Sequence, residues 1–447
     1  MATASVDDTA LDVGKEDLPP TNDVAATRPY DEPNISTDEF WNKDFSEQDE
    51  IFARLRQQRP VSWQRPIETA VSPDPDDVGF WAVVRHDDIV EVSQRSDVFV
   101  SRYGVHFDQL PREHQELAQS FLAMDDPQHN RLRRLVASTF TPRQIRRIED
   151  DIASRARRIV AAAAEKDAAG ESVDFVTDIS KHLPIQMFGD MFGVPEELRP
   201  AVAHAADELV AWADPELLAG RDAGEVNVAA VLAIRAIAEE LAAQRRKSPE
   251  SDLLTSLVQA EVDGEKLTDS EIAAIMVLFS VAATDTTRHT ASFAVKALTD
   301  FPDQRRWLWD DFEDRIGGAV EEFLRWGSVV LTFRRTAVAG YELGGQRILP
   351  GDKVVLMYAS GNRDAGVFDP VTFDLGRHPN RQIAFGGGGV HYCLGTHLAK
   401  SMLRSLFREL YRQMPDFIAG EPKLMKTNFM RGVLSLPFEP NRRAVRP

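Results

Sequence analysis

A single cysteine, Cys393, occurs in this chain of 447 residues. One thiol can form no disulfide within the chain, and it cannot supply the paired ligands of a structural zinc site. The fold therefore depends on its hydrophobic core, for which the 43% of hydrophobic residues is sufficient. Three roles are left for the thiol: a metal ligand as the thiolate, a covalent nucleophile, or an inert buried side chain.

The residues around Cys393 favour the ligand role. Four consecutive glycines at 386–389 remove side-chain bulk, so that a flat cofactor could press against the backbone there. Gly395 keeps the far side of the sulfur open, and a helical pattern over residues 394–413 places the sulfur near a helix N-terminus. The partial positive charge and free N–H groups at that end of a helix stabilise a thiolate. A buried structural cysteine beside a flexible turn is the alternative.

Hydrophobic periodicity predicts a mainly α-helical protein with a minor β part. Residues 145–165 and 229–246 are alanine-rich with a helical period, whereas residues 80–84 and 353–358 have the composition of strands. Between residues 212 and 225, a proline and two glycines predict a mobile loop between two helices. We expect one domain over residues 41–447. The acidic, proline-containing residues 1–40 are predicted to form a flexible N-terminal arm.

The strongest helix signal begins at Thr268 and runs to about Leu298. Thr268 and Glu271 form a capping-box pattern, and the apolar residues that follow predict a buried helix. Asp285 and Thr286 interrupt this apolar stretch, which is costly unless the polar groups are used. Hydroxyls that bond back to carbonyls loosen a helix, so we expect a locally opened helix that holds a water and passes protons. An ordinary capped or solvated polar turn is the alternative.

The net charge and the lack of other motifs argue against several classes of function. The formal net charge of −19 disfavours non-specific nucleic-acid binding. No run of about 18 apolar residues predicts a membrane span, and no signal pattern begins the chain, so a cytoplasmic protein is expected. The glycine run lacks the Lys-Ser/Thr of a phosphate loop, and neither a zinc-hydrolase nor a serine-hydrolase motif occurs. A local basic patch for an acidic protein partner, or equally a solvated helix face, is predicted for Arg131, Arg133, Arg134, Lys400 and Arg404.

The run from Phe385 through His391 and Cys393 to Gly395 resembles the haem-binding loop of cytochrome P450, although one extra glycine separates Phe385 from Cys393. The resemblance extends from about Trp41 to Pro437. It implies the prism-shaped, mostly helical fold of that family, with haem b between the 268–298 helix and the cysteine loop. Cys393 would then be the axial ligand of the iron.

The same resemblance implies roles for other residues. Asp285 and Thr286 match the acid–alcohol pair that relays protons during oxygen activation, with Ala283 in place of the usual glycine. Glu322, Arg325 and Arg377 match a structural ion-pair core that pins the haem-side segment. Haem-binding candidates are His129, Arg133, Arg335, Phe385 and His391 together with Cys393, where the cationic side chains would bind the haem propionates.

The implied reaction inserts one oxygen atom from dioxygen into an unactivated C–H bond. Because the sequence has no flavin or dinucleotide fingerprint and no cysteines for an iron–sulfur cluster, the two electrons are expected from a ferredoxin and its NAD(P)H-dependent reductase. The pocket is predicted to take an elongated apolar ligand. Its predicted lining is Phe107, Trp212, Phe279, Ala282, Ala283, Leu331, Phe333 and Met430.

Beyond the core motifs the chain resembles mycobacterial-type members that hydroxylate methyl-branched lipids and sterol side chains at terminal carbons. We therefore predict hydroxylation, at or near the terminal carbon, of a branched aliphatic, isoprenoid or sterol-side-chain lipid. Three alternatives stay open: a hydroxylase of a small acyclic terpene alcohol, a peroxide-driven haem-thiolate enzyme, and a haem-binding sensor or carrier without turnover.

Overall fold

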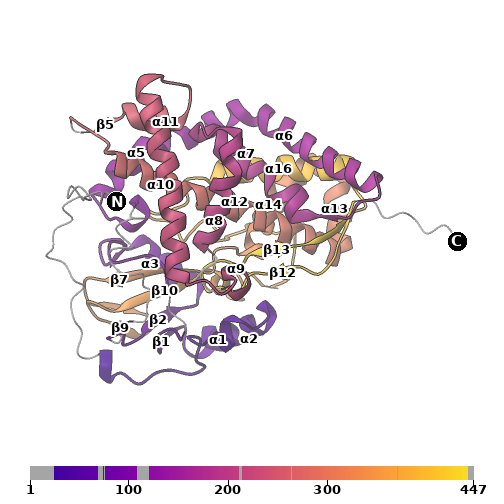
Figure 1. Ribbon diagram of the computed structural model, residues 1–447. Helices are drawn as coiled ribbons and strands as arrows, with labels where there is room; N and C mark the ends of the chain where they lie inside the picture. Colours follow the sequence, from indigo (N-terminus) through magenta and orange to yellow (C-terminus); the bar gives the residue numbers. More distant parts are fainter. Residues whose placement is uncertain are drawn as a thin grey trace.

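The computed structural model of the chain describes residues 25–68, 74, 76–107, 120–210, 214–262, 264–369 and 371–440. Helices make up most of this part, as predicted, and strands form a smaller part at the lower left of Figure 1. The helices are α1 (Asp38–Trp41), α2 (Phe45–Gln58), α3 (His86–Gln94), α5 (Gln128–Ala137), α6 (Pro142–Ala168), α7 (His182–Phe192), α8 (Arg199–Val210), α9 (Pro215–Leu218), α10 (Ala223–Lys247), α11 (Leu253–Gln259), α12 (Asp269–Asp300), α13 (Pro302–Asp310), α14 (Phe312–Gly327), α15 (Tyr358–Gly361) and α16 (Thr396–Gln413).

The largest sheet has the strand order β1-β2-β10-β7-β3 and pairs strands from residues 61–100 with strands from residues 332–357. Its central pair is parallel, with Trp81 of β2 opposite Val354 of β10, and these are the two strands predicted from the sequence. The strands of this sheet are β1 (Val61–Gln64), β2 (Phe80–Val83), β3 (Phe99–Val100), β7 (Thr332–Ala337) and β10 (Lys353–Met357). The short remaining strands are β4 (Val173–Asp174), β5 (Glu261–Val262), β6 (Glu265–Lys266), β8 (Tyr341–Leu343), β9 (Gln346–Ile348), β11 (Ile418–Ala419), β12 (Lys423–Leu424), β13 (Val433–Ser435) and β14 (Pro437–Glu439).

Helix α12 runs through the middle of the helical part and packs against α7, α8, α10 and α14. The predicted capping box is confirmed: the Thr268 hydroxyl accepts from the Glu271 N–H at 3.2 Å, and the Glu271 carboxylate accepts from the Thr268 N–H at 2.8 Å. In the described part, α12 is the one helix long and apolar enough to cross a membrane, but 67% of its apolar window is buried inside the protein. It is therefore the core helix of this fold.

Other helices extend beyond their predicted bounds because capping residues start them earlier. Thr141 caps α6 with its hydroxyl, and Asp222 caps α10 with its carboxylate. The predicted loop between residues 212 and 225 contains α9, whose first N–H groups are bound by the Asp214 carboxylate. From residue 214 onward, this connection is therefore folded.

From residue 25 the predicted N-terminal arm packs against the sheet. The Arg28 guanidinium lies 4.4 Å from the ring centre of Trp63 and 4.6 Å from that of Trp81, and it pairs with the buried Asp352 at 3.3 Å. Two aromatic faces and a buried carboxylate thus hold a segment that composition alone predicts to be loose. The first 24 residues lie outside the described part.

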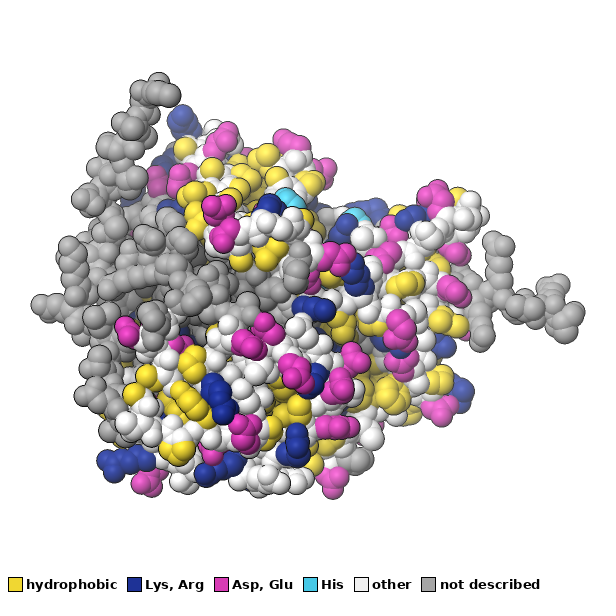
Figure 2. All heavy atoms as spheres, turned by 60° about the horizontal axis from the view of Figure 1, so that its bottom comes forward, with side chains coloured by type: hydrophobic (Ala, Val, Ile, Leu, Met, Phe, Trp, Pro, Cys, Tyr) yellow, Lys and Arg dark blue, Asp and Glu magenta, His cyan; other side chains and the backbone are white. Residues whose placement is uncertain are grey.

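Charged side chains are dispersed over the described part of one face of the protein. On the face shown in Figure 2, acidic and basic side chains are interspersed with apolar ones, and neither sign forms a continuous patch. The net charge of −19 is thus not concentrated on that face.

Candidate functional site

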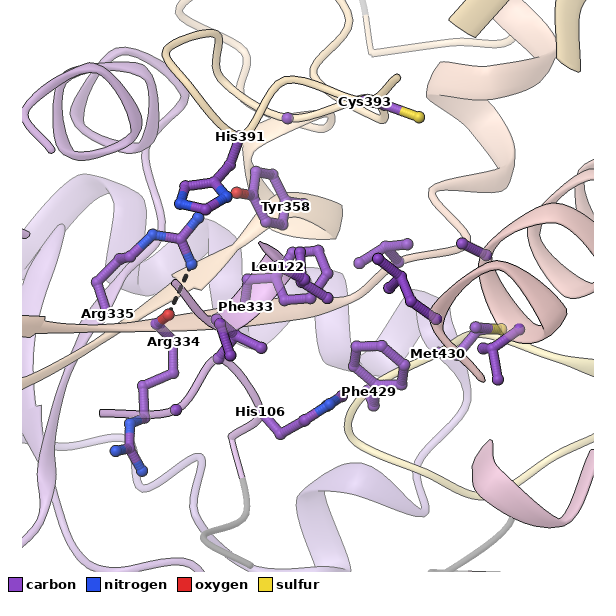
Figure 3. A pocket seen from close by; sticks show the side chains of 18 of the residues that line it. His106, Leu122, Phe333, Arg334, Arg335, Tyr358, His391, Cys393, Phe429 and Met430 are labelled. Carbon is purple, nitrogen blue, oxygen red and sulfur yellow. Dashed lines mark hydrogen bonds between the residues drawn. The ribbon is translucent and has the colours of Figure 1, made fainter. Parts of the chain in front are cut away.

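One cavity of about 1170 Å³ lies between α12, the cysteine loop and the end of β7. Figure 3 shows Cys393 on one side of it and His106 on the other, with mostly apolar side chains between them. Its apolar lining includes Leu122, Phe140, Val277, Phe279, Ala282, Ala283, Phe333, Phe429 and Met430. A space of this size and composition accommodates a flat cofactor together with an apolar ligand.

The glycine run before Cys393 is required by packing against α3 as well as by backbone conformation. Gly389 has φ +75°, and a Cβ there would lie 2.2 Å from the Ser93 carbonyl oxygen. A Cβ on Gly387 would lie 2.6 Å from the Ser93 hydroxyl, whereas one on Gly386 would meet nothing within 4 Å. The loop closes with the Cys393 N–H donating to the Phe385 carbonyl at 3.0 Å. The glycines thus keep the backbone close to α3 and leave the cavity side flat.

Cys393 is exposed, and it lines the cavity. Burial raises the pKa of the Cys393 thiol, while the Gly395 N–H, the Thr396 hydroxyl and Arg133 act in the opposite direction. The sulfur also lies beside the N-terminus of α16, which begins at Thr396. A thiol in this position becomes a thiolate when a metal cation binds it. The donors around it fit that anionic state.

Two arginines beside the cavity have no carboxylate partner among the described residues. Arg335 is 5% exposed and donates to the Arg334 carbonyl at 2.7 Å, and Arg133 donates to the Tyr392 carbonyl. Burial lowers the pKa of both guanidinium groups. A buried cation without a counter-charge, such as Arg335, is costly, and Arg133 is half-buried beside it, so this arrangement fits a ligand that carries carboxylates, such as the two propionates of haem.

The two histidines of this region take different positions. His391 lines the cavity, with Nε2 3.1 Å from the Ser101 hydroxyl. Burial and the neighbouring cations lower the pKa of His391 to about 2, so its ring is neutral. His129 lies behind it, with ring centres 4.1 Å apart, and the His129 nitrogens lie near the carbonyls of Phe121 (2.8 Å) and Val390 (3.1 Å). In this structure His129 therefore supports His391 instead of bordering the cavity.

Helix α12 presents hydroxyls to the cavity without opening. Thr286 lines the cavity and donates to the Ala282 carbonyl at 3.0 Å, and Thr284 donates to the Ser280 carbonyl at 2.5 Å. The predicted local opening is not observed, since α12 is continuous from Asp269 to Asp300. These side-chain bonds add to the helical ladder instead of replacing it.

Asp285 lies on the side of α12 away from the cavity and is 1% exposed. Its Oδ1 lies 3.2 Å from Arg288 Nη2, which also binds Asp207 of α8 at 2.6 Å. Burial raises the pKa of Asp285 to about 6, with Arg288 opposing the shift and Asp207 adding to it. A carboxyl with this pKa exchanges protons near neutral pH.

The predicted ion-pair core is assembled around Glu322. Arg325 donates from Nε to Glu322 Oε2 at 2.7 Å and from Nη2 to Oε1 at 2.5 Å, and both side chains are fully buried. Arg377 lies 3.4 Å from the same carboxylate, and Arg325 also donates to the carbonyls of Asn362 and Thr372. These bonds attach α14 to the segment that leads into the cysteine loop.

Five of the eight predicted pocket residues line the cavity: Phe279, Ala282, Ala283, Phe333 and Met430. Phe107 instead packs on Phe80 with ring centres 4.6 Å apart, and Leu331 lies in the same hydrophobic cluster. Trp212 lies outside the described residues. The sequence-based selection missed His106, whose neighbour Phe107 points away from the cavity. The segment is irregular and its direction is fixed by β7, so the sequence carried no local signal for His106.

Comparisons with known proteins identify the family of this chain. The sequence profile of the family "Cytochrome P450" matches residues 78–311 and 316–413. A methyl-branched lipid omega-hydroxylase of Mycobacterium tuberculosis is 39% identical over 401 residues, which cover 89% of this chain and 92% of the relative. A steroid C26-monooxygenase of Mycolicibacterium smegmatis is 37% identical over 394 residues, covering 86% of this chain and 88% of the relative. A solved Mycobacterium marinum cytochrome P450 in complex with pseudoionone superposes with a TM-score of 0.89 at 51% identity, covering 92% of this chain and 99% of that chain.

Proposed function

Because this chain belongs to the cytochrome P450 family of haem b monooxygenases, we propose that it hydroxylates a terminal or near-terminal carbon of a branched aliphatic, isoprenoid or sterol-side-chain lipid. The observation that carries the proposal is the large, mostly apolar cavity that ends at the Cys393 sulfur. An elongated apolar ligand buries its length in such a cavity. The relatives named for methyl-branched lipids and for steroid C26 support a substrate of this class.

The residues around Cys393 would hold haem b by complementary charge. The Cys393 thiolate binds the iron, whose chemistry when bound is the activation of dioxygen. Arg133 and Arg335 pair with the propionates, and His391 adds a neutral donor beside them. The flat glycine backbone at 386–389 leaves room for the cofactor near the sulfur.

Protons would reach the cavity along α12. With its pKa raised to about 6, Asp285 takes up and releases a proton near neutral pH. The neighbouring Thr286 hydroxyl lines the cavity and would deliver a proton there by turning away from the Ala282 carbonyl to which it donates in this structure. Asp207 connects this buried pair to solvent, since its side chain is 42% exposed and binds Arg288 at 2.6 Å. This arrangement supports a hydroxylase that uses dioxygen over a peroxide-driven enzyme, which needs no proton relay.

Electrons would come from a cytoplasmic ferredoxin and its NAD(P)H-dependent reductase. Three of the five basic residues considered for docking are already paired with carboxylates within the chain, among them Arg131 with Glu271 at 3.0 Å and Arg404 with Glu149 at 3.5 Å. Lys400 binds Glu321 in the same way. An acidic ferredoxin would therefore compete with these intrachain carboxylates, so its binding should be weak and sensitive to salt.

The test combines a spectrum with product analysis. The reduced protein with carbon monoxide should show the strongly red-shifted absorption band of thiolate-ligated haem, and Cys393→Ser should abolish it. With a surrogate ferredoxin and reductase, methyl-branched fatty acids, cholestenone and acyclic terpene alcohols should be screened for terminal hydroxylation. Asp285→Asn and Thr286→Ala should slow product formation or divert electrons to hydrogen peroxide while haem binding persists. Haem binding without any product or peroxide would support a sensor or carrier instead.

A further inference from the structure

His106 is held at the cavity wall by β7. The Arg334 N–H donates to the Val105 carbonyl at 2.8 Å, and the Arg334 guanidinium donates to the Tyr103 carbonyl. Val105 and Phe107 on either side of His106 are both buried. These contacts fix the backbone of the segment, and therefore the position of the imidazole, before any ligand binds.

The imidazole lies among apolar side chains on the side of the cavity opposite Cys393 (Figure 3). Its ring meets that of Phe429 edge to face, with centres 4.9 Å apart, and Phe429 packs on Phe333 at 5.7 Å. Part of the His106 surface is accessible, and His106 lines the cavity. His106 is therefore a polar group beside the apolar rings of Phe333 and Phe429, remote from the thiol, in a part of the wall that Arg334 also lines.

The charge state of this ring restricts what it can recognise. Burial and the charge of Arg334 lower the pKa of His106 to about 4, so the ring is neutral at physiological pH. A neutral imidazole offers one N–H donor and one acceptor. The Arg334 guanidinium points away from the ring in Figure 3, toward its bond with the Tyr103 carbonyl. A carboxylate bound at His106 would thus lose its hydration without gaining a direct counter-charge.

We propose that His106 is a specificity-determining residue that hydrogen-bonds one uncharged oxygen, a hydroxyl or carbonyl, at the end of the substrate remote from the hydroxylated carbon. This inference rests on the proposed hydroxylation. An apolar wall attracts a hydrocarbon chain without fixing its position along the cavity, because apolar contacts are not directional. One hydrogen bond at the far end fixes that position. It thereby decides which carbon lies nearest the thiol.

The test uses ligands with one isoprenoid skeleton and different ends: farnesol, farnesal, farnesoic acid and β-farnesene. Dissociation constants are measured on the haem-loaded enzyme from the ligand-induced shift of its absorption band, which requires no turnover. The wild type should bind farnesol and farnesal roughly 5- to 10-fold more tightly than farnesene, as expected for one hydrogen bond. Farnesoic acid should bind more weakly than farnesol at pH 7.5.

His106→Phe keeps the aromatic contact with Phe429 and removes the hydrogen bond. It should lower farnesol affinity to the level of farnesene, leave farnesene affinity within about twofold, and broaden hydroxylation from one carbon to several. His106→Asn, which keeps a donor and an acceptor, should recover part of the preference. Phe429→Leu is the matched control, since it removes apolar contact and should weaken both ligands by the same factor.

Equal affinity of the wild type for farnesol and farnesene, or a His106→Phe variant that keeps its preference for farnesol, would overturn the assignment. Tighter binding of farnesoic acid than of farnesol would also contradict it. Product analysis separates this inference from the proposed function. Preferred binding of farnesol without hydroxylation would leave the His106 contact in place and refute the hydroxylase. Hydroxylation whose product pattern is unchanged in His106→Phe would support the hydroxylase and refute the role of His106.

Discussion

Asp285 and Arg288 form a buried ion pair at 3.2 Å, three residues apart on α12. The two charges are not equally compensated. Arg288 has a second carboxylate partner, Asp207, at 2.6 Å, whereas Asp285 Oδ2 has no hydrogen-bond partner among the described atoms. The Asp285 carboxyl is thus incompletely compensated in a buried position. This gives it a pKa near the working pH and makes it costly to the fold.

Because burying the Asp285 carboxylate lowers the free energy of unfolding, we expect its replacement by asparagine to stabilise the protein by an amount that depends on pH. The folded-state pKa is raised to about 6 from an ordinary value of 3.8, so the Asp285 carboxyl destabilises the fold increasingly as the pH rises from 3.8, and its full cost is present above 6. This net shift already includes the attraction to Arg288. Asp285→Asn should therefore raise the unfolding free energy at pH 8 by on the order of 1 kcal/mol. The gain should shrink as the pH falls from 6 toward 3.8. Thermal unfolding of the haem-loaded enzyme at pH 8 and pH 5 checks this, and an equal gain at both values would contradict it.

The ion-pair core should be far more sensitive than a surface pair. Glu322→Gln removes the carboxylate that binds the buried Arg325 and should cost about 3–5 kcal/mol, with loss of haem retention. Glu313→Gln, which breaks the exposed 2.7 Å pair with Arg408, should cost less than about 1 kcal/mol. Urea unfolding monitored by tryptophan fluorescence compares the two variants. A similar small effect of both would show that Glu322 is dispensable.

Gly389 offers a test of packing in the cysteine loop that separates backbone strain from collision. Gly389 and Gly345 have nearly the same φ, +75° and +76°, but only at Gly389 would a Cβ meet another atom, the Ser93 carbonyl oxygen at 2.2 Å. Gly345→Ala should cost about 1–2 kcal/mol from the left-handed conformation alone. Gly389→Ala should cost more and also lower the haem content of the purified protein, read as the ratio of haem to protein absorbance. Normal haem content in Gly389→Ala would refute the packing argument.

Arg335 should have opposite effects on the protein with and without haem. In the haem-free chain its buried charge has no carboxylate partner among the described residues, so Arg335→Met should leave stability unchanged or raise it. With haem bound, loss of a charge-assisted bond to a propionate should speed haem release roughly 10- to 100-fold. Transfer of haem to apomyoglobin measures the rate. An unchanged rate of haem release in Arg335→Met would show that Arg335 does not bind a haem propionate.

The sequence predicted those features of the fold that depend only on residues close together in the sequence. The Thr268–Glu271 capping box, the strands at β2 and β10, and the order of residues around Cys393 all belong to this class. The direction in which Phe107 and His106 point depends on β7, which is distant in the sequence, and no periodicity in an irregular segment predicts it. Likewise, the position of His129 behind His391 depends on the Val390 carbonyl.

The cavity wall includes residues from Ala25 to Met430, nearly the whole described length of the chain. During synthesis, therefore, the iron ligand Cys393 and the wall at Phe429 are added only after the helices that form the rest of the cavity. A truncation upstream of Met430 would remove part of the wall, so such a chain would lack a closed site for the cofactor.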